Sequence, residues 1–181
     1  TIRRGLGLSR NTPAVKAMYI AGNGSPKPTV EFIRGLGNSE YCKQEEDSGG
    51  YGLSAAIGGC GAKQTELVNA YGTLARLGVR KKSTSVSEVI NSQNETLLKW
   101  KDESKQAVDP QAAYITNDIL SDRSSTLVTG SIPGVRASYK TGTSDKGNQP
   151  KDIWLASYTP ALAMTLWLGN SDSRTLTSIN S

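Results

Sequence analysis

The stretch that decides the fold is VRASYKTGTSDKGNQPKDIWLASYTPALAMTLWLGN, residues 135–170. It holds three apolar runs, separated by short breaks rich in Gly, Asn and Pro, within 136–169. Runs of this kind predict β-strands, and their short connections favour an antiparallel meander. The first run is interrupted by Lys140-Thr141-Gly142-Thr143. This is either a polar strand end that leads into a turn or one wall of an active site.

The preceding residues favour helices. Four segments begin at a residue that commonly caps a helix and then carry apolar side chains at helical spacing. Their predicted caps are Thr12, Thr29, Thr65 and Asp109. Residues near 84–101 alternate around a polar turn and predict a hairpin. Helices over most of 1–135, followed by strands, make the predicted fold α+β.

Composition excludes several kinds of chemistry. The chain has no histidine among its 181 residues, so Ser-His-Asp and Cys-His nucleophile systems are impossible within it. Any acid–base work must use a carboxylate or a lysine of lowered pKa. With few metal ligands available, we expect neither a metal nor another cofactor. A net charge of only +5 and 6% aromatic residues disfavour a nucleic-acid partner.

The two cysteines, Cys42 and Cys60, leave two possibilities open. They either pair as a disulfide in an oxidising compartment or remain unrelated free thiols.

Two polar motifs stand far apart in the sequence. Ser9-Arg10-Asn11 precedes the first predicted helix with a cap, and Lys140-Thr141-Gly142-Thr143 lies on a predicted strand. Taken singly, the first reads as capping chemistry and the glycine of the second as a bulge or a close backbone approach. Their order, Ser-x-Asn in a helical part and Lys-Thr-Gly on a strand, is typical of penicillin-recognising serine acyltransferases.

At these motifs the chain resembles the transpeptidase domain of class A penicillin-binding proteins. The resemblance extends over nearly all of 1–181, through SRNTPAVKA, LVNAYGTLARLGV, YITNDILSD and the stretch quoted first. It implies the penicillin-binding or β-lactamase-like fold, a helical half beside an antiparallel sheet. It also implies a peptidoglycan D,D-transpeptidase that acts through an acyl-enzyme and is inhibited by β-lactams.

The resemblance also implies roles for residues. Lys140, Thr141 and Thr143 would bind the terminal carboxylate of a D-Ala-D-Ala stem peptide, and Gly142 would let the substrate backbone approach the strand. The backbone N–H of Thr143 would form half of an oxyanion hole. Ser9 would relay protons between two lysines, and Asn11 would bind the substrate amide.

One motif of the family is missing. No serine in the sequence is followed by lysine three residues later, so Ser-x-x-Lys, which carries the nucleophile and its base, is absent. We therefore expect 1–181 to be the C-terminal portion of one transpeptidase domain, incomplete at both ends. An upstream segment or separate chain would carry the nucleophile.

Three alternatives stay open at this point. The protein is a D,D-carboxypeptidase if water accepts the acyl group, and a non-catalytic envelope-binding module if no nucleophile joins the site. A carboxylate-pair hydrolase would instead use Glu45, Glu46 or Asp47 from an acidic loop.

The resemblance places the protein on the outer face of the bacterial cytoplasmic membrane, with its anchor outside this sequence. If earlier strands and a final helix are absent, the sheet exposes apolar faces, and we expect poor solubility of the isolated chain.

Overall fold

The computed structural model describes residues 1–128 and 132–176 of the chain. The expected domain, 1–181, thus includes some positions outside the described residues. Its helices are α1 (Ile2–Gly7), α2 (Asn11–Ala21), α3 (Lys27–Gly35), α4 (Lys43–Asp47), the 3-10 helix η1 (Leu53–Ile57), α5 (Gln64–Ala75) and α6 (Pro110–Ser121). Its strands are β1 (Val79–Arg80), β2 (Glu88–Ile90), β3 (Thr96–Lys99), β4 (Lys105–Gln106), β5 (Ser138–Lys146), β6 (Gln149–Tyr158) and β7 (Ala163–Gly169).

The predicted antiparallel meander is confirmed. β5, β6 and β7 form one sheet in that order, and Lys140 lies opposite Ala156. The first two strands run further into the polar break than expected, because Gly147 and Asn148 alone make the turn. Both have positive φ, which suits a two-residue hairpin loop whose twist matches that of the strands.

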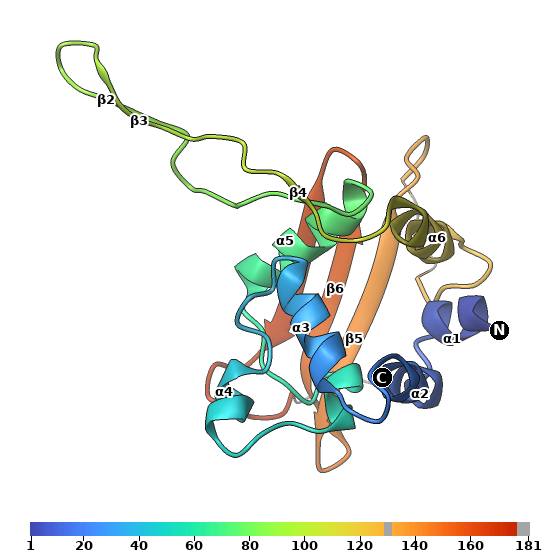
Figure 1. Cartoon of the computed structure of the whole chain (residues 1–181). Helices are drawn as coiled ribbons and strands as arrows, with labels where there is room; N and C mark the ends of the chain where they lie inside the picture. Colours follow the sequence, from blue (N-terminus) through green and yellow to red (C-terminus); the bar gives the residue numbers. More distant parts are fainter. Residues whose placement is uncertain (129–131, 177–181) are drawn as a thin grey trace.

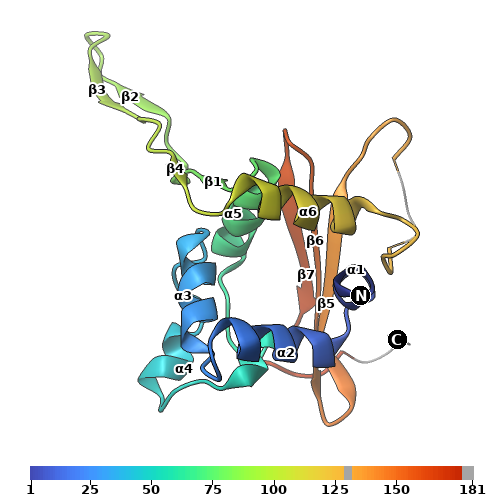
Figure 2. The ribbon, with the colours of Figure 1, turned by 45° about the vertical axis from the view of Figure 1, so that its right-hand side comes forward.

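Helices α5 and α6 cover one face of this sheet (Figures 1 and 2). Tyr158 anchors them: its hydroxyl donates to Asn117 Oδ1 of α6 at 2.8 Å, and its ring centroid lies 5.7 Å from that of Tyr71 in α5. Ala156, on the same face, is buried. Because side chains alternate along a strand, Lys140 shares this helix-covered face.

The opposite face of the sheet is apolar and open. Met164, Leu166 and Leu168 of β7 are each 46–47% exposed, and their neighbours on β6 include Leu155 and Ile153. We call these five residues the outer sheet face.

The observed N-caps of the helices differ in part from those that the sequence predicts. Asp109 caps α6 as predicted, since its carboxylate accepts from the backbone N–H groups of Gln111 and Ala112. The predictions for Thr12, Thr29 and Thr65 are wrong: the N-caps are Arg10, Pro26 and Lys63, none with a side-chain capping bond. The first turns of these helices extend upstream of the threonines, so the threonine side chains lie within the helices.

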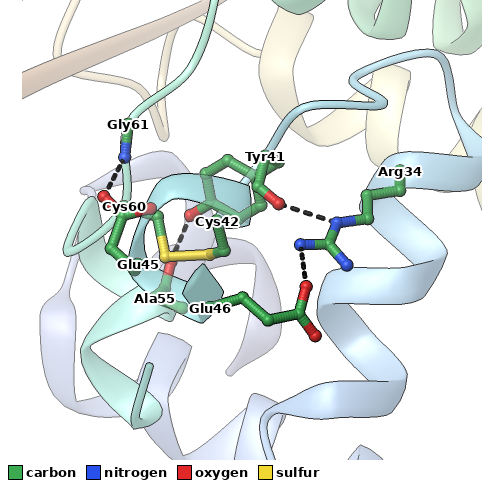
Figure 3. The surroundings of a disulfide bond; sticks show 8 residues. All are labelled: Arg34, Tyr41, Cys42, Glu45, Glu46, Ala55, Cys60 and Gly61. Carbon is green, nitrogen blue, oxygen red and sulfur yellow. Dashed lines mark hydrogen bonds and ion pairs between the residues drawn. A yellow bond between two sulfur atoms is a disulfide. The ribbon is translucent and has the colours of Figure 1, made fainter. Parts of the chain in front are cut away.

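A second core lies under α2 and α3. It gathers Met18, Val30, Tyr41, Cys42 and Ala55, all buried. Cys42 and Cys60 form a disulfide, which decides between the two possibilities left open above (Figure 3). The Tyr41 hydroxyl donates to the Ala55 carbonyl at 2.6 Å beside it.

Residues near 84–101 form the expected hairpin, β2 with β3. It stands away from the rest of the molecule in both views (Figures 1 and 2). The short antiparallel pair β1 and β4 joins it to the body. The sequence does not predict this pair, because two-residue strands show no periodicity.

Within the part of the chain that the structure describes, no helix is long and apolar enough to cross a membrane. The same residues contain no group of three or more His, Cys, Asp or Glu side chains placed to hold a metal.

Candidate functional site

The two sequence motifs meet at one contact. Lys140 Nζ lies 2.6 Å from Ser9 Oγ, although the residues are 131 positions apart. Lys140 Nζ also donates to the carbonyl oxygen of Thr141 at 2.6 Å. The lysine therefore reaches from the sheet to the segment between α1 and α2.

The backbone explains how Ser9 is presented. α1 ends in a Schellman motif: the Ser9 N–H bonds to the Leu6 carbonyl at 3.1 Å, and the Arg10 N–H to the Gly5 carbonyl at 2.9 Å. Ser9 occupies the left-handed position of this motif, with φ of 54°. Glycine is the usual residue there, because a Cβ atom makes the conformation costly. Nothing in the sequence GLSRN signals this ending, so the sequence analysis missed it.

Lys140 is electrostatically unusual. Burial lowers the pKa of its ammonium group from the ordinary value, because desolvation disfavours the charged form. Among the described residues, no carboxylate lies within ion-pair distance of it. A lysine of this kind gives up and takes back a proton more readily than a solvated one.

Asn11 is not brought into contact with Lys140 or Ser9 by any hydrogen bond among the described residues. It is the first residue of α2 and is exposed. It lines an open cavity of about 430 Å³ together with Thr12, Val15, Lys16, Tyr19 and Leu53. Neither Ser9 nor Asn11 caps α2, so capping does not account for the Ser-x-Asn motif.

Gly142 is not required by the fold. Its φ is not positive, the register shift of β5 lies between Ser144 and Asp145, and a Cβ added at Gly142 would meet only Trp154 Cβ, at an ordinary 3.7 Å. The bulge and the close backbone approach considered above are therefore not the reason for this glycine. The described fold would therefore accept a larger side chain at this position.

Thr141 and Thr143 alternate with Lys140 and Gly142 along β5. Thr143 is exposed. In the described sheet, β5 pairs only with β6, so its other edge presents backbone N–H and C=O groups.

Asp152 supports the far end of this strand. It accepts from the Ser144 hydroxyl at 2.7 Å and from Trp167 Nε1 at 3.1 Å, which ties β5 and β7 to β6. Burial works to raise the pKa of Asp152, but the hydrogen bonds from Ser144, Trp167 and Lys151 hold it below its usual value.

The acidic segment forms helix α4 rather than the loop that the sequence predicted, and its carboxylates have a structural role. Glu46 pairs with Arg34 at 2.9 Å, and Glu45 Oε1 accepts from the Gly61 N–H at 2.8 Å, both close to the disulfide (Figure 3). Two of the three carboxylates proposed for a hydrolase thus hold the loop together, which disfavours that alternative.

Comparison with known proteins identifies the family. The family model described as the penicillin binding protein transpeptidase domain matches residues 1–173. Penicillin-binding protein 1A of Clostridium tetani is 31% identical over 126 residues, which are 66% of this chain and 15% of that protein. Penicillin-binding protein 2D of Bacillus subtilis is 27% identical over 186 residues, covering 99% of this chain and 25% of that protein.

The fold is similar to that of a solved structure, penicillin-binding protein PonA1 from Mycobacterium tuberculosis, with a TM-score of 0.84. The identity is 20%, and the match covers 97% of this chain and 50% of the solved one. A second structure shows PonA1 in complex with penicillin V. This chain thus spans about half of the solved relative and a quarter or less of these curated ones.

Proposed function

This chain belongs to the family of penicillin-binding protein transpeptidase domains, and from that premise we propose that it supplies two walls of a D,D-transpeptidase site. The observation that carries the proposal is the 2.6 Å contact between Lys140 Nζ and Ser9 Oγ, beside the free edge of β5. The substrate is the D-Ala-D-Ala end of a peptidoglycan stem peptide, and β-lactams react in its place.

The reaction has two steps. A serine hydroxyl attacks the carbonyl carbon of the penultimate D-alanine, and the terminal D-alanine leaves with the serine proton, giving an ester. An amine of a second stem peptide then displaces the serine and forms the cross-link. Since no Ser-x-x-Lys occurs in these 181 residues, we assign the nucleophile to a segment outside them.

The residues of this chain take three roles in the proposal. Lys140 supplies positive charge to the substrate carboxylate, helped by the hydroxyls of Thr141 and Thr143. Ser9 passes a proton between Lys140 and the nucleophile's own lysine, which suits the lowered pKa of Lys140. We assign half of the oxyanion hole to the Thr143 N–H, because β5 has an unpaired edge and Gly142 brings no side chain to it.

Asn11 completes the substrate contacts by binding a backbone amide of the stem peptide from the first turn of α2. The disulfide supports a location outside the cytoplasm, since such bonds persist in oxidising compartments. We place the site on the outer face of the cytoplasmic membrane.

Intact-mass analysis of the natural full-length protein after exposure to a penicillin tests the proposal. We expect one covalent adduct, on a serine outside the sequence shown, and slower adduct formation in Lys140→Ala. Lys146→Ala is the matched control, because Lys146 is an exposed lysine at the other end of the same strand. An adduct on a serine of this chain would refute the assignment of the nucleophile, and no adduct at all would favour a binding module.

A D-Ala-D-Ala peptide offered with and without an amine acceptor then separates the two enzymatic alternatives. A cross-linked product supports a transpeptidase. Hydrolysis alone, at any acceptor concentration, would show a D,D-carboxypeptidase.

A further inference from the structure

Four charged side chains join the two segments that carry Ser9 and Lys140. Arg3 lies on α1, Asp118 on α6, Asp122 just after α6, and Arg136 just before β5. We call these four residues the charged bridge. None of them belongs to the Ser-x-Asn or Lys-Thr-Gly motif, although Asp118, Asp122 and Arg136 lie in segments that carry the family resemblance.

Asp118 is the centre of the charged bridge. Its Oδ2 accepts from Arg3 Nη2 at 2.6 Å, and its Oδ1 accepts from Arg136 Nη2 at 2.6 Å. One carboxylate on α6 therefore holds helix α1, which ends just before Ser9, and the residue four positions before Lys140.

Two further contacts strengthen the bridge. Arg3 Nη1 binds Asp122 Oδ2 at 3.0 Å, and Arg136 Nε donates to the Ser121 hydroxyl at 3.0 Å. Each arginine is thus bound through two of its nitrogen atoms. Two bonds fix the orientation of the planar guanidinium group as well as holding it in place.

Close backbone packing brings α1 against the end of α6. Gly7 is buried, and a Cβ added to it would lie only 1.9 Å from the Ser125 carbonyl oxygen. Packing therefore limits how α1 lies against the end of α6, and the charged bridge adds polar contacts from α1 to α6 and to the residues before β5.

The bridge is suited to positioning rather than to overall stability. Arg3 and Arg136 are 41% and 67% exposed, and exposed ion pairs contribute little to the free energy of unfolding. The catalytic rate is more sensitive to such contacts, because a misplacement of about 1 Å in an active site lowers the rate on the order of 100-fold. Asp118 links the two segments whose side chains must meet within hydrogen-bond distance.

We propose that Asp118 is a positioning residue, which holds Ser9 against Lys140 by binding Arg3 and Arg136 at the same time. The inference rests on the proposed function for its effect on catalysis, but the bridge also has a purely structural consequence. Without the Asp118 charge, α1 and the start of β5 lose their common anchor, and only the contacts of Arg3 with Asp122 and of Arg136 with Ser121 remain.

The test is Asp118→Asn in the natural full-length protein, with penicillin acylation and amide hydrogen exchange as readouts. Asp102→Asn is the matched control, because it removes the carboxylate that pairs with Lys81 next to the β2–β3 hairpin. Asp118→Glu is the conservative variant, since it keeps the carboxylate. Asp118→Asn is also tested in a protein that already carries Ser9→Ala.

We expect Asp118→Asn to slow acylation by about tenfold, with partial recovery in Asp118→Glu and no change in Asp102→Asn. In the Ser9→Ala background the same substitution should change the rate by less than about twofold, because the contact that it positions is already gone. A loss of equal size in both backgrounds, or no loss in either, would overturn the inference.

Hydrogen exchange separates this inference from the proposed function. Residues 3–10 and 138–141 should exchange faster in Asp118→Asn than in Asp102→Asn. If the wild-type protein does not react with penicillin, the proposed function fails, and exchange still decides the positioning role. Unchanged exchange in both segments would refute it whatever the acylation rate.

Discussion

Ser9 combines an unfavourable backbone conformation with a contact that depends on its hydroxyl. Its φ of 54° lies in the left-handed region, where glycine is the usual residue at a helix end. A residue held in such a conformation is a reason to look for function at that position. Here the same residue contacts Lys140, so the chemistry accounts for the choice of serine.

Replacement of Ser9 by glycine and by alanine separates the two properties. Both variants lack the hydroxyl and should lose acylation to the same extent. Ser9→Gly should be more stable than Ser9→Ala by about 1 kcal/mol, since alanine keeps the Cβ at positive φ. Urea unfolding of the two variants measures the difference, and equal stabilities would show that the backbone at this position is not strained.

Asp122 makes stability depend on pH. Hydrogen bonds from Ser124 and then Ser125, with help from Arg3, lower the pKa of Asp122 to about 2. A carboxyl group whose pKa is lowered by folding stabilises the protein above its unfolded pKa, near 4, and loses that contribution as the pH falls toward 2. Unfolding followed from pH 5 to pH 2 should therefore show a steeper loss of stability in wild type than in Asp122→Asn.

At the scale of elements, helix α6 has the side-chain cap that the sequence predicted. Its N-terminus is capped by Asp109 and begins at Pro110, and it carries Asn117 and Asp118 toward the sheet. Caps of this kind satisfy N–H groups that the helix itself leaves unpaired.

Asp109→Ala should lower the free energy of unfolding by about 1 kcal/mol, because the cap of α6 is lost. Thr65→Ala is the control: the sequence predicts that Thr65 is a cap, but the structure has Lys63 in that position without a side-chain bond. Chemical denaturation should therefore find Thr65→Ala within about 0.5 kcal/mol of wild type. A larger loss in Thr65→Ala than in Asp109→Ala would contradict this assignment of caps.

The disulfide also stabilises the protein at the scale of elements. It joins Cys42 to Cys60 across 18 positions and closes the loop that contains α4 and η1. Breaking a bridge over such a loop costs about 3 kcal/mol in the chain-entropy description. Reduction should lower the denaturation midpoint of wild type by a corresponding amount and leave a Cys42→Ala/Cys60→Ala variant unchanged. Equal midpoints for reduced and oxidised wild type would show that α3 and α5 hold the loop without the bridge.

At the scale of the whole molecule, the two faces of the sheet differ. One face is covered by α5 and α6 (Figure 2), whereas Met164, Leu166 and Leu168 on the outer sheet face are nearly half exposed. Contiguous apolar surface of this kind favours association in water.

We therefore expect residues 1–181, produced alone, to self-associate or precipitate. Replacing Met164, Leu166 and Leu168 by serine together should reduce the association, because all three lie on the outer sheet face. Sedimentation velocity over a range of concentrations measures it. A monodisperse wild-type monomer that unfolds cooperatively would refute the expectation.

The sequence by itself determined the three strands of the sheet, the start of α6 and the residue types of the candidate site, but not the starts of α2, α3 and α5 or the β1–β4 pair. Alternation and short polar turns identified the three strands of the sheet, and Asp109-Pro110 identified the start of α6, because these signals act between near neighbours in the chain. The absence of histidine and the two motifs narrowed the chemistry to lysine and hydroxyl groups.

Only the tertiary structure decided which distant groups meet. The Ser9–Lys140 contact, the Cys42–Cys60 bond and the charged bridge around Asp118 join residues up to 131 positions apart. No local preference encodes such pairs, since they form only when α1, α6 and β5 pack against one another. The conformation of Ser9 belongs with them, because glycine would favour it locally and the contact with Lys140 explains why serine is there instead.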